Sequence, residues 1–258
     1  LPPAGSNKGT DPDNWMEIWN NVFMEYNRID ENTLVKLPKQ NVDTGMGLER
    51  ANCILQGKTS VYLTEVFQPI IKTIEELSNY TYGTDEEKDK SVRIIADHSR
   101  SSVFILGDQR GVTPDRVGAG YVLRRLIRRA VRHGMKLGIE ESFLAKIAET
   151  VVANFKIAYP ELEQNSEKIY KELTAEEEKF RKTLLKGEAE FQKLLPNLMK
   201  NPKKIISGKV AYNLYETYGF PLELTQELGA ENGFTVDVEG FKEAERKHQE
   251  ASKTADAG

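Results

Sequence analysis

Val42-Asp43-Thr44-Gly45-Met46-Gly47-Leu48-Glu49-Arg50 is the stretch that organises the first part of this chain. It predicts a short strand over residues 40–44 that leads into a helix over residues 46–56. Its two glycines carry no Cβ, so a ligand can approach the backbone closely. Asp43 can hold an ammonium group, and Arg50 offers a planar, permanent charge for a phosphate or a ring face. The stretch therefore predicts a site for a nucleotide beside an amine.

The segment before this stretch is predicted to be a loop followed by a strand. Residues 1–14 are rich in Pro, Gly, Ser, Asn and Asp, which is typical of a loop. Residues 15–27 place large apolar side chains on both faces of a strand, so we expect both faces to be covered. Residues 28–40 are polar and predict a connection. Because two strands do not form an independently stable sheet, residues 1–60 are predicted to be the C-terminal part of a larger α/β domain.

Downstream, the apolar residues recur with the 3.6-residue period of helices. Ser207 can cap the start of one helix, Gly219 can end it, and Pro221 can open the next. Pro196 and Pro202 are expected to break the chain between helices. Helices are expected over residues 63–77, 94–106, 123–137, 143–155, 165–195, 207–219, 221–233 and 238–253.

These patterns together predict an α+β fold that is mostly α. The first domain is expected over residues 1–60. A helical domain is expected over residues 61–258, with a possible division into two subdomains near residues 196–207.

Composition and charge exclude several classes of function. The net charge of −4 means that binding of nucleic acid requires a local basic patch. The single cysteine, Cys53, excludes an internal disulfide framework and a multi-cysteine zinc site. No apolar run approaches the length of a membrane span, and residues 1–13 lack the pattern of a signal peptide. We therefore expect a cytoplasmic protein that has no membrane contact and no zinc site.

Residues 122–136 combine an apolar side with a strongly basic one at the angular period of a helix. One interpretation is a solvated face whose charges are met by neighbouring acids. The other is a surface for RNA phosphates, since five arginines with no acid between residues 116 and 136 repel one another unless an anion is near. We favour the phosphate interpretation. The basic side comprises Arg124, Arg125, Arg128, Arg129, Arg132 and Lys136.

Other candidate residues have ordinary structural interpretations as well. Asn20 lies between apolar neighbours on its strand face, so its amide either bonds to nearby backbone or faces a polar ligand. Asp43 either caps a turn or binds a cation, and Arg50 taken alone is a surface residue. His98 is expected to make a structural hydrogen bond, and Cys53 to be a small core residue.

The quoted stretch also carries a family resemblance. With its Gly-x-Gly-x-x-Arg pattern it resembles motif 3 of the class II aminoacyl-tRNA synthetases, and the chain more narrowly resembles the alanyl-tRNA synthetases. The matching segments occur in the order of that family. They are Glu17-Ile18-Trp19-Asn20, Val22-Phe23-Met24, Val42 to Arg50, Ala96-Asp97-His98, Gly120 to Arg125, Arg128 to Gly134, and Tyr218-Gly219-Phe220-Pro221.

The resemblance implies a fold and a set of ligand contacts. The chain would hold the C-terminal part of the class II antiparallel α/β domain, followed by a helical tRNA-recognition domain. Asp43 would bind the α-ammonium group of alanine, Asn20 and Gly45 would line the amino-acid pocket, and Val22 would keep it small. The residues implied for ATP are Gly45, Gly47 and Arg50.

The resemblance also implies a reaction. Alanine attacks the α-phosphate of ATP to give alanyl-adenylate, and the alanyl group then passes to the 3′ end of tRNA(Ala). This chemistry depends on positioning and electrostatics, so no covalent nucleophile is assigned; Mg²⁺ is expected with ATP. The acceptor stem of the tRNA would be the partner of the helical domain. The residues implied for tRNA are Asp115, Arg116, Arg124, Arg125, Arg128, Arg129, Arg132 and Glu216.

The sequence departs from the family pattern in three respects. Motifs 1 and 2 do not occur in it, so we expect that the chain alone does not form alanyl-adenylate. The family's editing domain with its zinc site does not occur either. Asp115-Arg116 stands where the family often has Ser-Asn, and Glu216 where it has the Asp that helps to read the third acceptor pair, a G·U wobble. Arg116 cannot accept a hydrogen bond, so a different set of contacts would read that pair.

The sequence leaves one alternative function open and excludes another. A catalytically inactive module that binds the tRNA acceptor stem is the alternative, although such a module does not need Asp43, Gly45, Gly47 and Arg50. A P-loop ATPase is excluded because the sequence contains no Gly-Lys-Ser/Thr element.

Overall fold

The computed structural model describes residues 3–7, 9–11, 14–115 and 117–255. The chain divides into two compact units, Leu1–Pro69 and Ile70–Gly258, which are described separately below. In the part of the chain that the structure describes, no helix is both long enough and apolar enough to cross a membrane.

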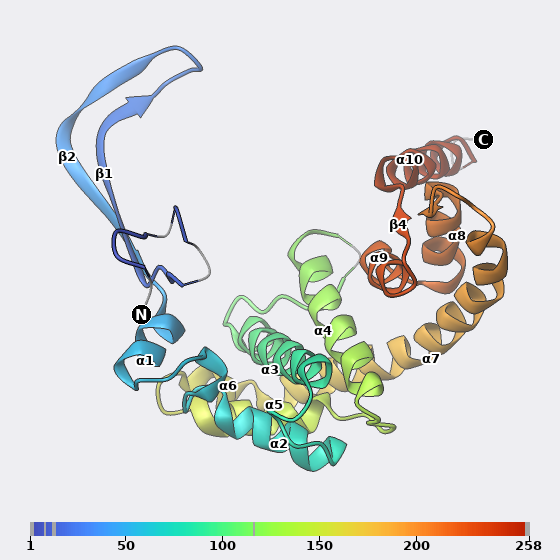
Figure 1. Ribbon diagram of the computed structural model, residues 1–258, viewed down its shortest axis with the longest axis horizontal. Coiled ribbons are helices and arrows are strands. Elements are labelled where there is room, and N and C mark those ends of the chain that lie inside the picture. Colours follow the sequence, from blue (N-terminus) through green and yellow to red (C-terminus); the bar gives the residue numbers. More distant parts are fainter. Residues whose placement is uncertain (1–2, 8, 12–13, 116, 256–258) are drawn as a thin grey trace. The chain divides into compact units, whose positions relative to one another are not determined.

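The first unit is built on a long antiparallel hairpin of β1 (Trp19–Arg28) and β2 (Leu34–Met46), drawn in blue in Figure 1. The pairing shifts register between Met24 and Tyr26. The prediction of a strand before the glycines is confirmed, but the predicted connection over residues 28–40 is wrong, because strand β2 already begins at Leu34. Polar side chains are tolerated in β2 since its faces are exposed, and their polarity made the segment resemble a loop.

Both faces of the hairpin are open to solvent. Phe23 is 80% exposed and Trp19 is 56% exposed, although both are large apolar residues. The expectation that this strand is covered on both faces is therefore wrong for the described chain. The physical reason is that β1 and β2 form a sheet of two strands with no further layer on it among the described residues.

Helix α1 (Leu48–Leu55) follows the hairpin directly and is succeeded by the short 3₁₀ turn η1 (Val61–Leu63). The helix predicted over residues 46–56 is thus confirmed. Cys53 is buried, and its thiol donates a hydrogen bond to the Lys58 carbonyl oxygen at 3.2 Å. It is the core residue that was expected.

The second unit is helical. Helix α4 packs against α3 and α7, and α5 packs against α7 (Figure 1). The core of the second unit contains fully buried aliphatic side chains, for example Ile95, Leu123 and Ile147, one from each of three helices. Along each segment such side chains recur at helical spacing, which explains why these segments fold as helices. The helices of this part are α2 (Gln68–Ser78), α3 (Glu86–Gly107), α4 (Gly118–Lys136), α5 (Leu144–Phe155), α6 (Pro160–Gln164) and α7 (Ser166–Met199).

The end of the chain adds three helices and a small parallel sheet. Ser207 accepts a hydrogen bond from the Val210 amide at the start of α8, and Gly219 ends that helix with a left-handed φ of 65°. Both predicted caps are confirmed. Helix α9 packs on α8 and β4, and α10 packs on α8. The elements are β3 (Ile205–Ile206), α8 (Gly208–Tyr218), α9 (Leu222–Glu231), β4 (Thr235–Val236) and α10 (Val238–Ala255).

One expectation about this region is wrong, and one element of it was not predicted. Pro196 does not end the long helix, because α7 continues to Met199. Proline removes one hydrogen bond, and this loss is tolerated so close to the helix end. The β3–β4 pair was not anticipated, because a strand of two residues shows no period.

Candidate functional site

The register of the hairpin brings four of the expected ligand residues into one block. Asn20 lies opposite Gly45, and Val22 lies opposite Asp43. Directly paired residues of an antiparallel ladder project to the same face, as do residues two apart on one strand. All four residues therefore share one face of the hairpin. A Cβ added at Gly45 would meet no atom within 4 Å, so the glycine leaves open space in the middle of the block.

Side-chain hydrogen bonds on the opposite face of the hairpin stabilise the register of the two strands. Trp19 Nε1 donates to Thr44 Oγ1 at 2.5 Å, and Thr44 Oγ1 donates to the Asn21 side chain at 2.8 Å. Asn21 thus makes the cross-strand bond, while no described residue bonds to the side chain of Asn20. Asp43 lies within β2, so the interpretation of Asp43 as a turn cap is wrong. The amide of Asn20 and the carboxylate of Asp43 are both exposed on the block.

The head of α1 fixes Arg50. The Gly47 amide donates to the Ile18 carbonyl at 3.0 Å, which joins the start of the helix to β1. Arg50 Nη1 donates to the Glu17 carbonyl at 2.7 Å. A Cβ on Gly47 would lie 3.3 Å from Arg50 Cδ, so the glycine lets this side chain lie close to the backbone. The first unit therefore presents a carboxylate, an amide and a guanidinium that can meet an ammonium group and a phosphate.

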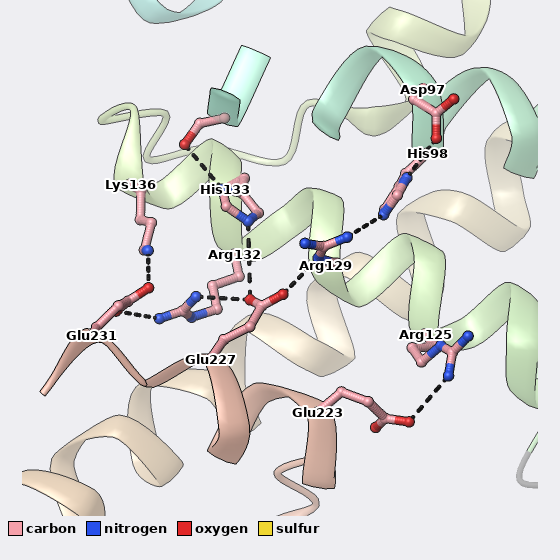
Figure 2. A network of polar contacts seen from close by, with 11 residues as sticks. Asp97, His98, Arg125, Arg129, Arg132, His133, Lys136, Glu223, Glu227 and Glu231 are labelled. Carbon is pink, nitrogen blue, oxygen red and sulfur yellow. Dashed lines mark hydrogen bonds and ion pairs between the residues drawn. The ribbon is translucent and has the colours of Figure 1, made fainter. Parts of the chain in front are cut away.

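The basic side of α4 is engaged by acids from distant parts of the sequence (Figure 2). The predicted helix over residues 123–137 is confirmed, but its basic side is not open. Glutamates of α7 and α9 approach every member of it, as the alternative interpretation of neighbouring acidic partners anticipated. Contact of these side chains with RNA phosphates stays a prediction. The pairs are Arg124–Glu176, Arg125–Glu223, Arg128–Glu176, Arg129–Glu227, Arg132–Glu188, Arg132–Glu227, Arg132–Glu231 and Lys136–Glu231.

Arg128 is an interior residue. Its side chain is 3% exposed, its Nε donates to Glu176 at 2.6 Å, and its Nη1 donates to the Gly219 carbonyl at 3.0 Å. The guanidinium also lies over the Phe180 ring, 4.9 Å from its centroid. Burial lowers the pKa of Arg128, and the charge of Glu176 opposes that shift. The pair is part of the packing between α4 and α7.

Arg132 is surrounded by three carboxylates although its side chain is only 2% exposed. Glu227 lies at 3.0 Å and Glu231 at 2.9 Å, both on α9, and Glu188 of α7 lies at 3.7 Å. Burial raises the pKa of Glu188, while the charge of Arg132 opposes this rise. Arg132 therefore joins three helices through one guanidinium.

Two histidines belong to the same network. His98 approaches Asp97 at 3.0 Å through Nδ1 and Arg129 at 3.3 Å through Nε2, which agrees with its expected structural role. His133 is buried, and its Nδ1 lies 2.9 Å from Ser91 Oγ. Burial, followed by the charges of Lys136 and the neighbouring arginines, lowers the pKa of His133 to about 3, so this imidazole is neutral at physiological pH.

Two of the remaining residues expected to contact tRNA, Asp115 and Glu216, lie two positions and one position in sequence from residues that line a groove of about 350 Å³. Arg116 lies outside the described residues. Asp115 is exposed in the segment before α4, and Glu216 is exposed on α8, with its Oε1 3.7 Å from His248 Nδ1. The groove lies between the start of α4 and the helices α8, α9 and α10. Its lining includes Val117, Tyr121, Tyr215, Phe241 and Glu245.

Sequence reasoning missed the acids that complete the network, above all Glu223, Glu227 and Glu231. Their spacing of four residues was a usable signal, because it places all three on one side of α9. The basic residues of α4 recur at similar spacing. Among the described residues, no group of three or more His, Cys, Asp or Glu side chains could hold a metal ion.

Comparison with known proteins identifies the class. The model of the family "tRNA synthetases class II (A)" matches residues 2–258. The chain therefore belongs to the class II tRNA synthetase family.

The more specific likeness is to alanine–tRNA ligases. The protein of that name from Treponema denticola is 58% identical over 98% of this chain and 42% of its own length. The one from Borreliella burgdorferi is 52% identical over 93% of this chain and 40% of its own length. The one from Natranaerobius thermophilus is 44% identical over 96% of this chain and 28% of its own length. The chain thus spans less than half the length of these relatives.

Proposed function

We propose that this chain is part of an alanine–tRNA ligase and contributes one side of its alanine and ATP pocket. The block of four residues on the hairpin carries this proposal. Asp43 would hold the ammonium group of alanine and Asn20 would bond to a polar group of the same ligand. Val22 would limit the size of the side chain, and Gly45 would leave room for the amino acid.

The head of α1 is proposed to meet ATP. Gly47 allows the nucleotide to approach the backbone, and Arg50 carries a permanent positive charge for the adenine face and the terminal phosphate. Its hydrogen bond to the Glu17 carbonyl fixes part of the guanidinium in advance, which lowers the entropic cost of binding. Mg²⁺ would accompany ATP and be held largely by its phosphates.

The helical unit is proposed to bind the acceptor stem of tRNA(Ala) in the cytoplasm. We place the stem at the groove beside the start of α4, whose lining includes Val117 and Tyr215, the latter next to Glu216 in sequence. The wide minor groove of an RNA helix displays ribose hydroxyls and base edges, and exposed carboxylates can accept hydrogen bonds from such donors. We favour the ion pairs of the α4 arginines over their expected contacts with phosphates, because RNA would first have to displace their carboxylate partners.

The test of the pocket is alanine-dependent pyrophosphate exchange by the natural protein that contains this chain, with Asp43 changed to Asn. Loss of a charge-assisted bond to the ammonium group should raise the KM for alanine by about tenfold to a hundredfold, while the KM for ATP stays within about threefold. An unchanged KM for alanine would contradict the assignment of Asp43. Asp30→Asn, in the exposed turn of the same hairpin, is the matched control.

The isolated 258-residue chain should not catalyse this exchange, because motif 2, which the family uses for the α-phosphate, is not in this sequence. Exchange clearly above background would overturn that expectation. The alternative function, an inactive module that binds the acceptor stem, would be favoured if the natural protein itself gave no exchange above background while RNA binding persisted.

A further inference from the structure

Three glutamates on one side of α9 meet the basic side of α4 in matching order (Figure 2). Arg125 Nη1 lies 3.2 Å from Glu223, and Arg129 Nε lies 2.6 Å from Glu227. Further along both helices, Arg132 and Lys136 meet Glu231. We call this set of pairs the ladder.

Side-chain contacts rather than close backbone packing join the two helices at the ladder. Helix α4 packs mainly against α3 and α7, whereas α9 packs against α8 and β4. Two clefts of about 360 and 310 Å³ lie between α4 and α9, and both are lined by members of the ladder. Extended charged side chains therefore bridge α9 and α4.

One end of the ladder forms part of the groove proposed to receive RNA. Glu223, besides pairing with Arg125, accepts a hydrogen bond from the Tyr121 hydroxyl, whose oxygen lies 3.3 Å from each carboxylate oxygen. Tyr121 and Glu223 both line the groove of about 350 Å³. Tyr215 of its lining precedes Glu216, which stands where the family pattern has the Asp implied for the third acceptor pair.

We propose that the ladder is a positioning device that sets the width of this groove and, through it, the discrimination between RNA stems. Glu223, Arg125, Arg129 and Glu227 are positioning residues in this proposal, which rests on the proposed function for its RNA partner. The burial of Arg132 among three carboxylates favours this role over a surface held open for phosphates, because a charge that is already compensated and desolvated gains little from a further anion.

The first experiment needs no RNA. Spin labels at Val122→Cys on α4 and Lys242→Cys on α10 report the distance across the groove by pulsed electron resonance, with the buried Cys53 left unlabelled. The wild-type ladder should give one narrow distance distribution. Glu223→Gln combined with Glu227→Gln should broaden or shift it, whereas Glu163→Gln with Glu178→Gln, a matched change of charge at two exposed acids of α6 and α7, should not. Identical distributions in all three proteins would overturn the proposal.

The second experiment measures dissociation constants of the 258-residue chain for two RNA hairpins that differ only in a G·U or G·C third pair. Glu223→Gln should reduce the ratio of the two constants by about threefold or more, since a misplaced contact loses part of the free energy of discrimination for one base pair. The exchange Arg125→Glu with Glu223→Arg keeps the pair and should restore the ratio. A substitution that only destabilises the protein would raise the dissociation constants of both RNAs by the same factor.

If Glu223→Gln raises both dissociation constants equally and leaves their ratio unchanged, the proposed role of the ladder in discrimination is overturned. If the wild-type chain does not separate the two RNAs at all, the proposed recognition of RNA fails. The distance measurement still decides in that case whether the ladder sets the groove.

Discussion

The hairpin of the first unit exposes large apolar side chains, whereas helix α4 of the second unit buries charged ones. Each arrangement is the reverse of what the residue types alone suggest. On the hairpin, aromatic residues such as Phe23 are open to solvent. On α4, the guanidinium groups of Arg128 and Arg132 are buried. The hairpin therefore leaves apolar side chains open to solvent, whereas the two buried arginines of α4 pair with glutamates of α7 and α9. Residue type alone did not reveal this difference, because burial depends on what the rest of the chain places nearby.

The largest effect is expected where a buried charge loses its partner. Glu176→Ala leaves Arg128 inside the protein with no carboxylate, so the free energy of unfolding should fall by about 3–5 kcal/mol. Urea denaturation monitored by circular dichroism measures this loss. The matched control is Glu239→Ala, whose pair with Lys242 is solvent-exposed and should contribute less than about 1 kcal/mol. Equal losses for both variants would show that α4 is not held by its buried pairs.

The next effect concerns the capping of α5. Glu177 is fully buried and accepts hydrogen bonds from the amides of Phe143 and Leu144 while it pairs with Arg181. Glu177→Ala leaves two amides without a partner, which should lower the free energy of unfolding by about 2–4 kcal/mol. Glu178→Ala, an exposed neighbour on α7, serves as the control. A loss below about 1 kcal/mol for Glu177→Ala would mean that water replaces the carboxylate.

A smaller effect depends on pH and comes from His133. Its pKa is lowered to about 3 in the folded chain, whereas an unfolded histidine titrates near 6.5. As the pH falls below 6.5, the unfolded state binds a proton that the folded state refuses. Stability present above that pH is therefore lost progressively as the pH falls toward 3. The slope approaches about 1.4 kcal/mol per pH unit for one proton.

Replacement of this histidine isolates its contribution. Between pH 6.5 and 5.5 the wild-type chain should lose more stability than His133→Asn by up to about 1 kcal/mol. Parallel curves for wild type and His133→Asn would show that the imidazole is accessible to protons in the folded chain.

The smallest effect is expected on the hairpin. Phe23→Ser removes an aromatic ring that is 80% exposed, so the free energy of unfolding of the 258-residue chain should change by less than about 0.5 kcal/mol. The same substitution at Phe143, which is buried, should cost several times more. A loss above about 1 kcal/mol at Phe23 would mean that the ring packs within this chain.

The sequence allowed the local features of the molecule to be predicted, and the long-range ones only in part. Caps at Ser207 and Gly219, the helix after the glycines and the buried Cys53 follow from residues close together in the chain. The partners of the α4 arginines lie about 50–100 residues away, so local periodicity could not assign them. The spacing of Glu223, Glu227 and Glu231 suggests the pairing only after α9 is known to lie beside α4.

The candidate pocket was predicted residue by residue, but its geometry depends on register. Asn20 and Asp43 come from two strands, and the backbone pairing of β1 with β2 brings them to one face. The start of β2 was missed because Leu34 to Gln40 contains Pro38 and three polar residues that interrupt its apolar pattern. The length of the hairpin, and the exposure of both its faces, therefore could not be read from composition.

The most direct test of the inward direction of the α4 charges is the salt dependence of RNA binding. Arg125→Gln and Arg129→Gln remove two half-exposed cations of the ladder, and the dissociation constant of the 258-residue chain for an acceptor-stem hairpin is measured across a range of salt concentrations. If these cations pair with Glu223 and Glu227 rather than with phosphates, the slope of log K against log salt should stay within about 0.5 of the wild-type value. A slope that shrinks by about 0.9 for each arginine removed would contradict this account and show direct contacts with RNA phosphates.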